Sequence, residues 1–119
     1  MIEGIGIDII ELDRINQSIK RNPRFVQRIL TENEYQRYEM LNEGRRVEFL
    51  AGRFAAKEAC AKALGTGIGK TGFQDIEISS AETGAPQASV RGMEHLKIWV
   101  SISHSSQHAI AQVVLERNT

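Results

Sequence analysis

The sequence predicts an α+β domain in which a long helix packs on a mainly antiparallel sheet. After one short strand, helical patterns fill the first half of the chain. Patterns of period two, separated by short connections, fill the second half. The length of 119 residues suits one folded unit, so residues 1–119 are expected to form a single domain.

The first predicted element is a strand over residues 3–10. It is rich in isoleucine, which favours burial on at least one side. Gly4 and Gly6 indicate a bulge or a place where another group approaches the backbone closely. Apolar residues at helical spacing then predict a short helix from residue 12 that ends near Asn22-Pro23, and a second helical turn over 24–30.

Two further helices are predicted before the chain reaches a glycine-rich segment. Residues 31–34 match a capping box, in which a threonine hydroxyl and a glutamate carboxylate each satisfy a free backbone donor. A helix is therefore expected over 32–41. After an interruption at 42–44, the long helix is expected over 45–64. Gly65 would end it, since glycine adopts the left-handed backbone conformation without strain.

The second half predicts short strands joined by tight connections. They are expected over residues 75–79, 87–91, 98–103 and 109–115. Residues 83–86 predict the turn between the first two strands. His104 is expected in the loop between the last two, where it is either a phosphate ligand or an ordinary turn residue.

Composition narrows the class of protein. The formal net charge is zero, so bulk electrostatics gives nucleic-acid binding no support. No apolar run approaches the roughly 20 residues of a membrane span, and the N-terminus lacks the pattern of a signal peptide. The single cysteine, Cys60, is expected in the core and fits a reducing compartment. We therefore expect a cytoplasmic protein that binds neither nucleic acid nor a membrane.

The segment from residue 14 to residue 30 is locally basic, although the whole chain is neutral. Such a face favours a specific acidic partner. Phe25 is its one aromatic residue, too few for the base stacking of an RNA-binding surface. The basic residues of the segment are Arg14, Lys20, Arg21, Arg24 and Arg28.

Two glycine patterns resemble nucleotide-binding motifs, and both fail. Gly4 and Gly6 would open a dinucleotide fingerprint, but the third glycine position holds Ile9. The segment from Gly65 to Thr71 resembles a P-loop, but its spacing is one residue short and it follows a helix instead of a strand. Two interpretations remain for this loop: a nest of backbone donors for a phosphate, or a simple helix stop.

The long helix carries charged residues among six alanines. Arg53, Lys57 and Lys62 are three cations beside one acid, Glu58, and this set could bind a polyphosphate while the acid holds a divalent metal. The alternative is a surface ion pair between Glu58 and Lys62, which have a favourable spacing of four residues.

Asp8 stands alone in its isoleucine-rich strand. It is either an outward-facing strand residue or a ligand for magnesium, which takes oxygen ligands from one or two carboxylates and completes its shell with water and phosphate oxygens. Asp8 and Glu58 are the best-motivated carboxylate pair, and Glu11 is a possible third acid.

Together these motifs resemble one family, the bacterial holo-acyl-carrier-protein synthases, which are the short class of phosphopantetheinyl transferases. The resemblance covers nearly the whole chain. Its most specific parts are the early Gly-Ile-Asp at residues 6–8 and an F-x-x-K-E-x-x-x-K helix. Further matching segments are residues 28–31, 48–69, 73–77 and 100–104. The helix motif reads Phe54, Lys57, Glu58 and Lys62 in this chain.

The resemblance implies the 4'-phosphopantetheinyl transferase fold and a reaction. The 4'-phosphopantetheine group of coenzyme A would pass to a serine of apo acyl carrier protein, releasing adenosine 3',5'-bisphosphate in fatty acid biosynthesis. It implies Mg²⁺ held by Asp8 and Glu58, with Lys62 neutralising charge on the pyrophosphate. Either Glu58 or a metal-bound water would accept the serine proton. Members of this length resemble homotrimers with active sites shared between adjacent subunits.

The resemblance also implies the binding residues. For coenzyme A these are Arg53, Lys62, Gly65, Thr66, Gly67 and His104. For the acidic carrier protein they are Arg14, Arg21, Arg24, Phe25 and Arg28. The competing hypothesis is a non-catalytic nucleotide- or carrier-binding module, whose binding would need neither carboxylate and no magnesium.

Overall fold

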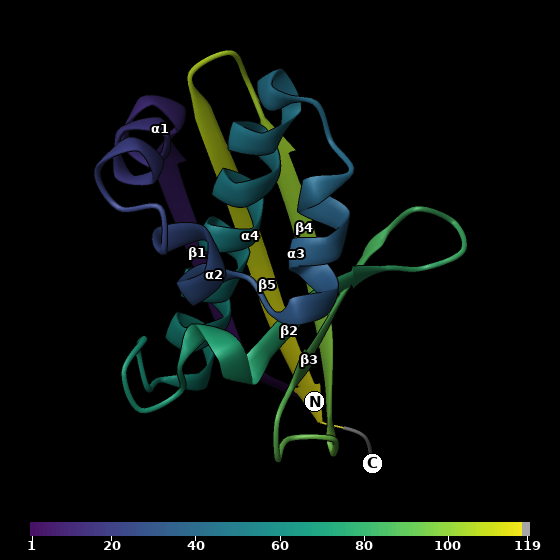
Figure 1. Ribbon diagram of the computed structural model, residues 1–119. Coiled ribbons are helices and arrows are strands. Elements are labelled where there is room, and N and C mark those ends of the chain that lie inside the picture. Colours follow the sequence, from purple (N-terminus) through teal and green to yellow (C-terminus); the bar gives the residue numbers. More distant parts are fainter. Residues whose placement is uncertain (118–119) are drawn as a thin grey trace.

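The computed structural model describes residues 1–117. Among these residues, no helix is long and apolar enough to cross a membrane. The order of elements follows the predicted one (Figure 1). The elements are β1 (Ile2–Glu11), α1 (Leu12–Arg21), α2 (Phe25–Ile29), α3 (Glu32–Glu39), α4 (Glu43–Leu64), the 3-10 turn η1 (Phe73–Asp75), β2 (Ile76–Ser80), β3 (Pro86–Val90), β4 (Leu96–His104) and β5 (His108–Arg117).

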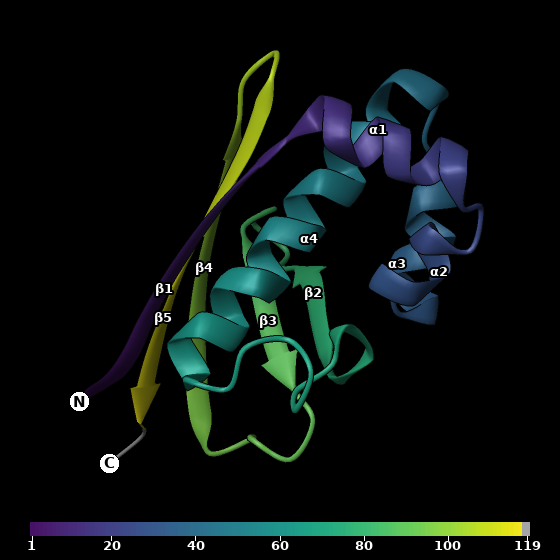
Figure 2. The same cartoon turned by 90° about the vertical axis from the view of Figure 1, so that its left-hand side faces the viewer.

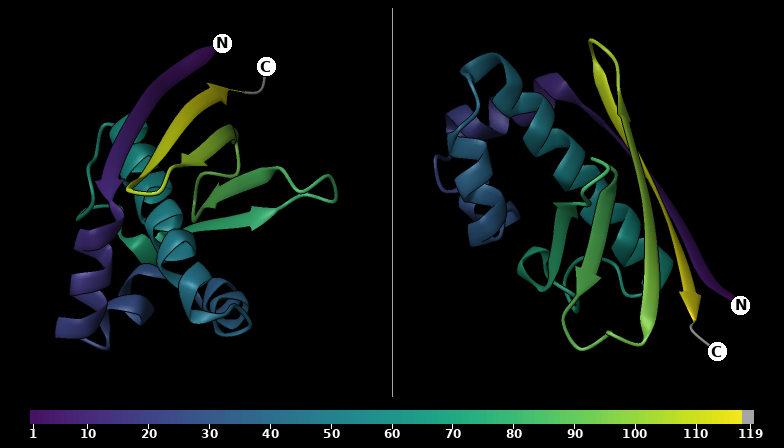
Figure 3. Two further views of the ribbon diagram at one scale, coloured as in Figure 1. Left: turned by 90° about the horizontal axis from the view of Figure 1, so that it is seen from above. Right: turned by 90° about the vertical axis from the view of Figure 1, so that its right-hand side faces the viewer.

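The strands form one antiparallel sheet in the order β1-β5-β4-β3-β2, so the first and last strands of the chain lie side by side. All four helices cover the same face of this sheet, with α4 lying directly on it (Figure 2). The β2–β3 hairpin diverges from the other strands (Figure 3), and β3 pairs with β4 only between Gln87 and Trp99. The predicted α+β class with a long helix on a mainly antiparallel sheet is confirmed.

The helix ends are explained by local capping. The capping box at Thr31 and Glu34 is present as predicted. Helix α4 begins at Glu43, two residues earlier than expected, because the Asn42 side chain accepts a hydrogen bond from the Arg45 amide at 3.0 Å. Gly65 ends α4 with φ at 77°, the left-handed conformation that glycine supplies.

The strand bounds differ from the predicted ones by one to two residues, and two residues that were expected in a turn or loop lie in strands. Pro86, expected in the turn, is the first residue of β3 and pairs with Ser80 of β2. His104, expected in a loop, is the last residue of β4 and pairs with Ala109 of β5. Both expectations were wrong because they rested on the turn preference of each local segment. Pairing with the neighbouring strand extends β3 and β4 to include these residues. The turn η1 was not predicted.

The close packing of β1 on α4 depends on glycine. A Cβ on Gly4 would lie 2.2 Å from the Ala63 carbonyl oxygen, and one on Gly6 would lie 1.9 Å from that of Ala59. The expectation that something approaches these glycines closely is confirmed, and the approaching group is the α4 backbone. The alanine-rich face of α4 allows this approach because it projects little beyond the helix.

Three isoleucines of β1 lie on the opposite face from the helix, whereas Ile10 is buried in the core. Ile5, Ile7 and Ile9 are 64%, 59% and 58% exposed, so the isoleucine-rich side of the strand is the outer one. Trp99 and Ile110 of the neighbouring strands are also exposed large apolar residues. The inner face of β1, by contrast, presents Gly4, Gly6, Asp8 and Ile10 to the helix layer.

Candidate active site

Asp8 reaches α4 because it shares the inner face of β1 with the two glycines. Its side chain is 17% exposed, so the interpretation of an outward-facing strand residue is wrong. The Lys62 ammonium donates to Asp8 Oδ1 at 3.0 Å and to the Ile7 carbonyl at 3.0 Å. The lysine side chain is itself 52% exposed, which leaves this ion pair open to a ligand.

Glu58 lies on the same side of α4, one turn before Lys62. The lysine pairs with Asp8 and not with Glu58, so the predicted helix-surface ion pair does not form. Burial raises the pKa of the Glu58 carboxyl, the nearby Asp8 carboxylate raises it further, and Lys62 opposes both effects. The two carboxylates therefore repel each other across a shared site, a repulsion that a divalent cation between them would relieve.

The donors present fit a hard divalent cation that keeps other oxygen ligands. Asp8 and Glu58 supply two carboxylates, and Mg²⁺ is commonly held by one or two carboxylates plus water and substrate phosphates. Within residues 1–117, no group of three or more His, Cys, Asp or Glu side chains could hold a metal ion. The suggestion that Glu11 is a third acid at this site is therefore wrong.

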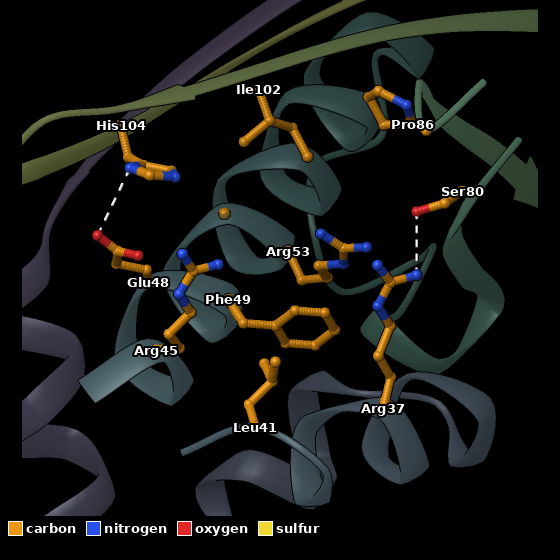
Figure 4. A pocket seen from close by; sticks show the side chains of 12 residues that line it. Arg37, Leu41, Arg45, Glu48, Phe49, Arg53, Ser80, Pro86, Ile102 and His104 are labelled. Carbon is orange, nitrogen blue, oxygen red and sulfur yellow. Dashed lines mark hydrogen bonds and ion pairs between the residues drawn. The ribbon is translucent and has the colours of Figure 1, made fainter. Parts of the chain in front are cut away.

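A second cluster lies in a cavity of about 300 Å³ between α3, α4 and the strands β2, β3 and β4. Figure 4 shows Arg53 and His104 there, approached by two further arginines, Arg37 and Arg45. The Arg53 guanidinium lies 4.2 Å from the centroid of the Phe49 ring, and its Nε is buried without a partner among the described residues. The cavity thus offers several cationic groups to an anion.

His104 and Glu48 close one end of this cavity. The His104 Nδ1 lies 3.6 Å from Glu48 Oε1, a contact that becomes an ion pair when the imidazole is protonated. At the far end, Arg37 donates to the Ser80 hydroxyl at 3.1 Å (Figure 4). Sequence reasoning missed Arg37, Arg45 and Glu48. Helical spacing places Arg45 and Glu48 on the α4 face that leads to Arg53, so their spacing was a usable signal.

The two clusters do not meet within the chain. Lys62 lies nine residues after Arg53, which is about two and a half helical turns, so the two side chains leave opposite sides of α4. Asp8, Glu58 and Lys62 are absent from the residues that line the arginine-rich cavity. The structure therefore brings together the proposed metal ligands and separates them from Arg53 and His104.

The loop after α4 is engaged with the helix itself. The amides of Thr66 and Gly67 both donate to the Ala61 carbonyl at 3.2 Å, and the Gly65 amide donates to the Lys62 carbonyl at 3.0 Å. These donors are already used in ending the helix, so the interpretation as a phosphate nest at Gly65, Thr66 and Gly67 is not supported. The loop can still form a wall of the site beside Lys62.

Lys57 does not join Arg53 and Lys62 as a ligand-binding cation. It is completely buried, and its ammonium donates to Glu34 Oε1 at 2.6 Å, to the Ile29 carbonyl at 2.7 Å and to the Phe73 carbonyl at 3.1 Å. The expectation that Lys57 helps to bind a polyphosphate is wrong, because all three of its protons are already donated within the protein.

The basic segment is displayed on α1 and α2, directly after β1. Its four arginines are exposed, as an acidic partner would require. Phe25 is half-buried, and its ring centroid lies 6.2 Å from that of Phe54 on α4, so it packs α2 against α4. The arginines are Arg14, Arg21, Arg24 and Arg28.

Nearly the whole chain is similar in sequence and in structure to known proteins. A model of the 4'-phosphopantetheinyl transferase superfamily matches residues 4–113. The holo-[acyl-carrier-protein] synthase of Oceanobacillus iheyensis is 58% identical over 116 residues, 98% of each chain. A crystal structure of the Bacillus anthracis synthase in complex with CoA (3',5'-ADP) is 50% identical, with a TM-score of 0.91 over 99% of both chains. The Helicobacter pylori synthase in complex with coenzyme A is 37% identical, with a TM-score of 0.83 over 94% of this chain and 99% of that one.

Proposed function

Because the chain belongs to the 4'-phosphopantetheinyl transferase superfamily, we propose that it transfers the 4'-phosphopantetheine group of coenzyme A to a serine of apo acyl carrier protein. The products are the holo carrier protein and adenosine 3',5'-bisphosphate, and the setting is fatty acid biosynthesis in the cytoplasm. The observation that carries the proposal is the convergence of Asp8, Glu58 and Lys62. High identity over nearly the full length of a named synthase supports it.

In this proposal Asp8 and Glu58 hold Mg²⁺, which when bound neutralises and polarises the pyrophosphate of coenzyme A. The two carboxylates alone would repel the pyrophosphate, so their role would be to hold the cation beside Lys62. Lys62 lies beside them and its side chain is half-exposed, so its ammonium can stabilise the negative charge that develops on the leaving phosphate. Positioning and charge stabilisation carry most of the rate in phosphoryl transfer, which suits a site of this simplicity.

The serine hydroxyl must lose a proton as it attacks the β-phosphate. The candidate acceptors remain Glu58 and a water on the metal. Bond formation to the serine oxygen releases the bisphosphate as the leaving group, so the proton is the only species that the protein must remove from the attacking group.

The arginine-rich cavity is proposed to bind the phosphate on the adenosine ribose, through Arg53 and His104. Since the cavity lies across α4 from Asp8, it would serve the site of a neighbouring subunit. The exposed apolar face at Ile5, Ile7, Ile9, Trp99 and Ile110 supports self-association, because a patch of this kind on a monomer marks an interaction surface. We therefore propose a homotrimer in which each active site is completed by two chains.

The acidic carrier protein is proposed to dock on α1 and α2, through the four exposed arginines and Phe25. Exposed charged surfaces of this kind raise the rate of association with a partner of opposite charge, and this increase becomes smaller as the salt concentration rises. The surface follows directly from β1, so a carrier bound there would lie near the strand that carries Asp8. Gly65, Thr66 and Gly67 are proposed to line the coenzyme site as a wall.

The test is to incubate the chain with coenzyme A, Mg²⁺ and apo acyl carrier protein and to measure the mass of the carrier. The expected result is an added phosphopantetheine group with wild type, and little or none with Asp8→Ala. An unmodified carrier with the folded wild-type chain would contradict the transferase. Coenzyme A binding that persists without Mg²⁺ and without both carboxylates would favour the non-catalytic binding module instead.

A further inference from the structure

Helix α2 is too short to be stable by itself. It has five residues, Phe25–Ile29, and isolated helices shorter than about 12 residues are marginal in water. The carbonyls at its C-terminal end have few helical partners of their own, so groups from elsewhere must satisfy them. Where these carbonyls find their donors therefore decides how α2 is held against the rest of the molecule.

Gln74 of η1 supplies one set of donors. Its Nε2 amide donates to the Gln27 carbonyl at 2.8 Å and to the Leu30 carbonyl at 2.8 Å, with a longer contact of 3.3 Å to the Arg28 carbonyl. A glutamine amide has two protons, so one of them is shared between carbonyls. One exposed side chain from outside α2 thus contacts three of its last backbone acceptors.

Lys57 of α4 supplies the remaining donor. Its buried ammonium contacts the Ile29 carbonyl at 2.7 Å, the one acceptor of this run that Gln74 does not reach. The same ammonium contacts the Phe73 carbonyl at 3.1 Å, immediately before Gln74. The four successive carbonyls of residues 27–30 therefore accept hydrogen bonds from two side chains, Gln74 and Lys57. These two residues are linked in turn, because Lys57 also donates to the carbonyl of Phe73, the residue before Gln74.

Lys57 and Gln74 connect two regions that have different proposed roles. Lys57 precedes Glu58, the proposed metal ligand, in the chain. Helix α2 carries Phe25 and Arg28 of the proposed carrier surface. We propose that Lys57 and Gln74 are positioning residues that orient α2, and with it the docked carrier protein, relative to the Asp8–Glu58 pair. This inference rests on the proposed function, since it concerns the same carrier substrate.

Of the two positioning residues, Gln74 can be changed with less disturbance to the core than the buried Lys57. The variant is Gln74→Met, which keeps the length of the side chain and removes both donor protons. Gln74 is exposed, so no buried charge is left unpaired. The matched control is Gln36→Met on α3. Gln36 is also exposed, and with Gln74 it lines a separate groove bounded by α2 and α3. It makes no side-chain hydrogen bond within residues 1–117.

The first readout is steady-state kinetics with both substrates. We expect Gln74→Met to raise the KM for the carrier about threefold to tenfold, the range that one hydrogen bond contributes. The KM for coenzyme A and the kcat at saturating carrier should match those of Gln36→Met, while the melting temperature falls modestly because hydrogen bonds to α2 are lost. A role in general stability alone would lower the melting temperature and the active fraction without changing the KM for the carrier.

The second readout is hydrogen exchange, which does not depend on activity. The amides of Arg28 and Leu30 bond to the carbonyls of Arg24 and Val26, and they should exchange faster in Gln74→Met while those of α4 keep their rates. Unchanged exchange, or faster exchange with an unchanged KM for the carrier, would overturn the positioning role. If the wild-type chain proves inactive, the proposed function fails, and the Kd for the carrier then replaces KM as the test of positioning.

Discussion

Lys57 and Lys62 lie five residues apart on α4, and each pairs with a carboxylate in very different surroundings. The Lys57–Glu34 contact is 2.6 Å long, and the two side chains are 0% and 1% exposed. The Lys62–Asp8 contact is 3.0 Å long, and its side chains are 52% and 17% exposed. The same two kinds of charged group thus form one pair inside the protein and another at its surface, on a single helix.

The difference lies in how much hydrogen-bonding capacity is left. Glu34 accepts from the Thr31 amide at 2.8 Å and from the Ile78 amide at 2.7 Å, besides Lys57. This pair is saturated and joins α2, α3, α4, η1 and β2. Asp8 uses one oxygen for Lys62, and no described residue donates to the other. A saturated buried pair positions elements, whereas a pair with free capacity can take a ligand.

The largest expected effect comes from breaking the buried pair. Lys57→Met should lower the free energy of unfolding by about 3–5 kcal/mol, because it leaves a buried carboxylate without its countercharge. Chemical denaturation measures this directly. The double variant Lys57→Met/Glu34→Gln should recover part of the loss by removing the orphaned charge. If the single variant is as stable as wild type, the pair has no structural role.

Breaking the exposed Lys62–Asp8 pair should lower enzymatic activity and leave the free energy of unfolding nearly unchanged. Lys62→Met should change the free energy of unfolding by no more than about 1 kcal/mol, as for other exposed ion pairs. It should lower kcat about 10²–10³-fold, the cost of losing a donor directed at developing charge. Denaturation and carrier-modification assays on the same preparation separate the two effects. Near-normal kcat would remove Lys62 from the proposed chemistry.

A smaller effect concerns Glu58 and pH. Its pKa is raised above the usual 4.5 in the folded state, so the folded protein holds this proton more tightly than the unfolded chain. With a chelator present, wild type should lose stability as pH rises from 4.5 through the raised value, and Glu58→Gln should lose less over that window. Glu82→Gln, in the exposed β2–β3 connection, is the matched control. Parallel curves for wild type and Glu58→Gln would contradict the raised pKa of Glu58, which burial and the Asp8 carboxylate cause.

Local signals allowed much of the fold to be predicted. The capping box at Thr31 and the stop at Gly65 depend on a few neighbouring residues, and both are present. The strand ends at Pro86 and His104 depend on pairing with distant residues, so local turn propensity misplaced them. The order of the sheet, which places β1 beside β5, likewise depends on contacts between the two ends of the chain.

The site was harder to predict because α4 has alanines on several sides. Without a strong contrast between apolar and polar faces, the sequence does not show that Lys57 points inward and Lys62 outward. The β1 pattern was similarly ambiguous, since Ile5, Ile7 and Ile9 face outward while the glycines face the helix. Asp8, Glu58 and Lys62 were nevertheless predicted as a group. Arg53 and His104 were assigned with Lys62 to the coenzyme A site, and the folded chain places them in a different cavity from Asp8, Glu58 and Lys62.

The most direct test of this contrast is calorimetric titration of the folded chain with coenzyme A, with and without Mg²⁺. Wild type should bind coenzyme A far more tightly when Mg²⁺ is present. Asp8→Asn should lose that dependence while keeping a melting temperature close to that of wild type. If Asp8→Asn binds coenzyme A with the same Kd and the same Mg²⁺ dependence as wild type, the Asp8–Lys62 pair is not a ligand site.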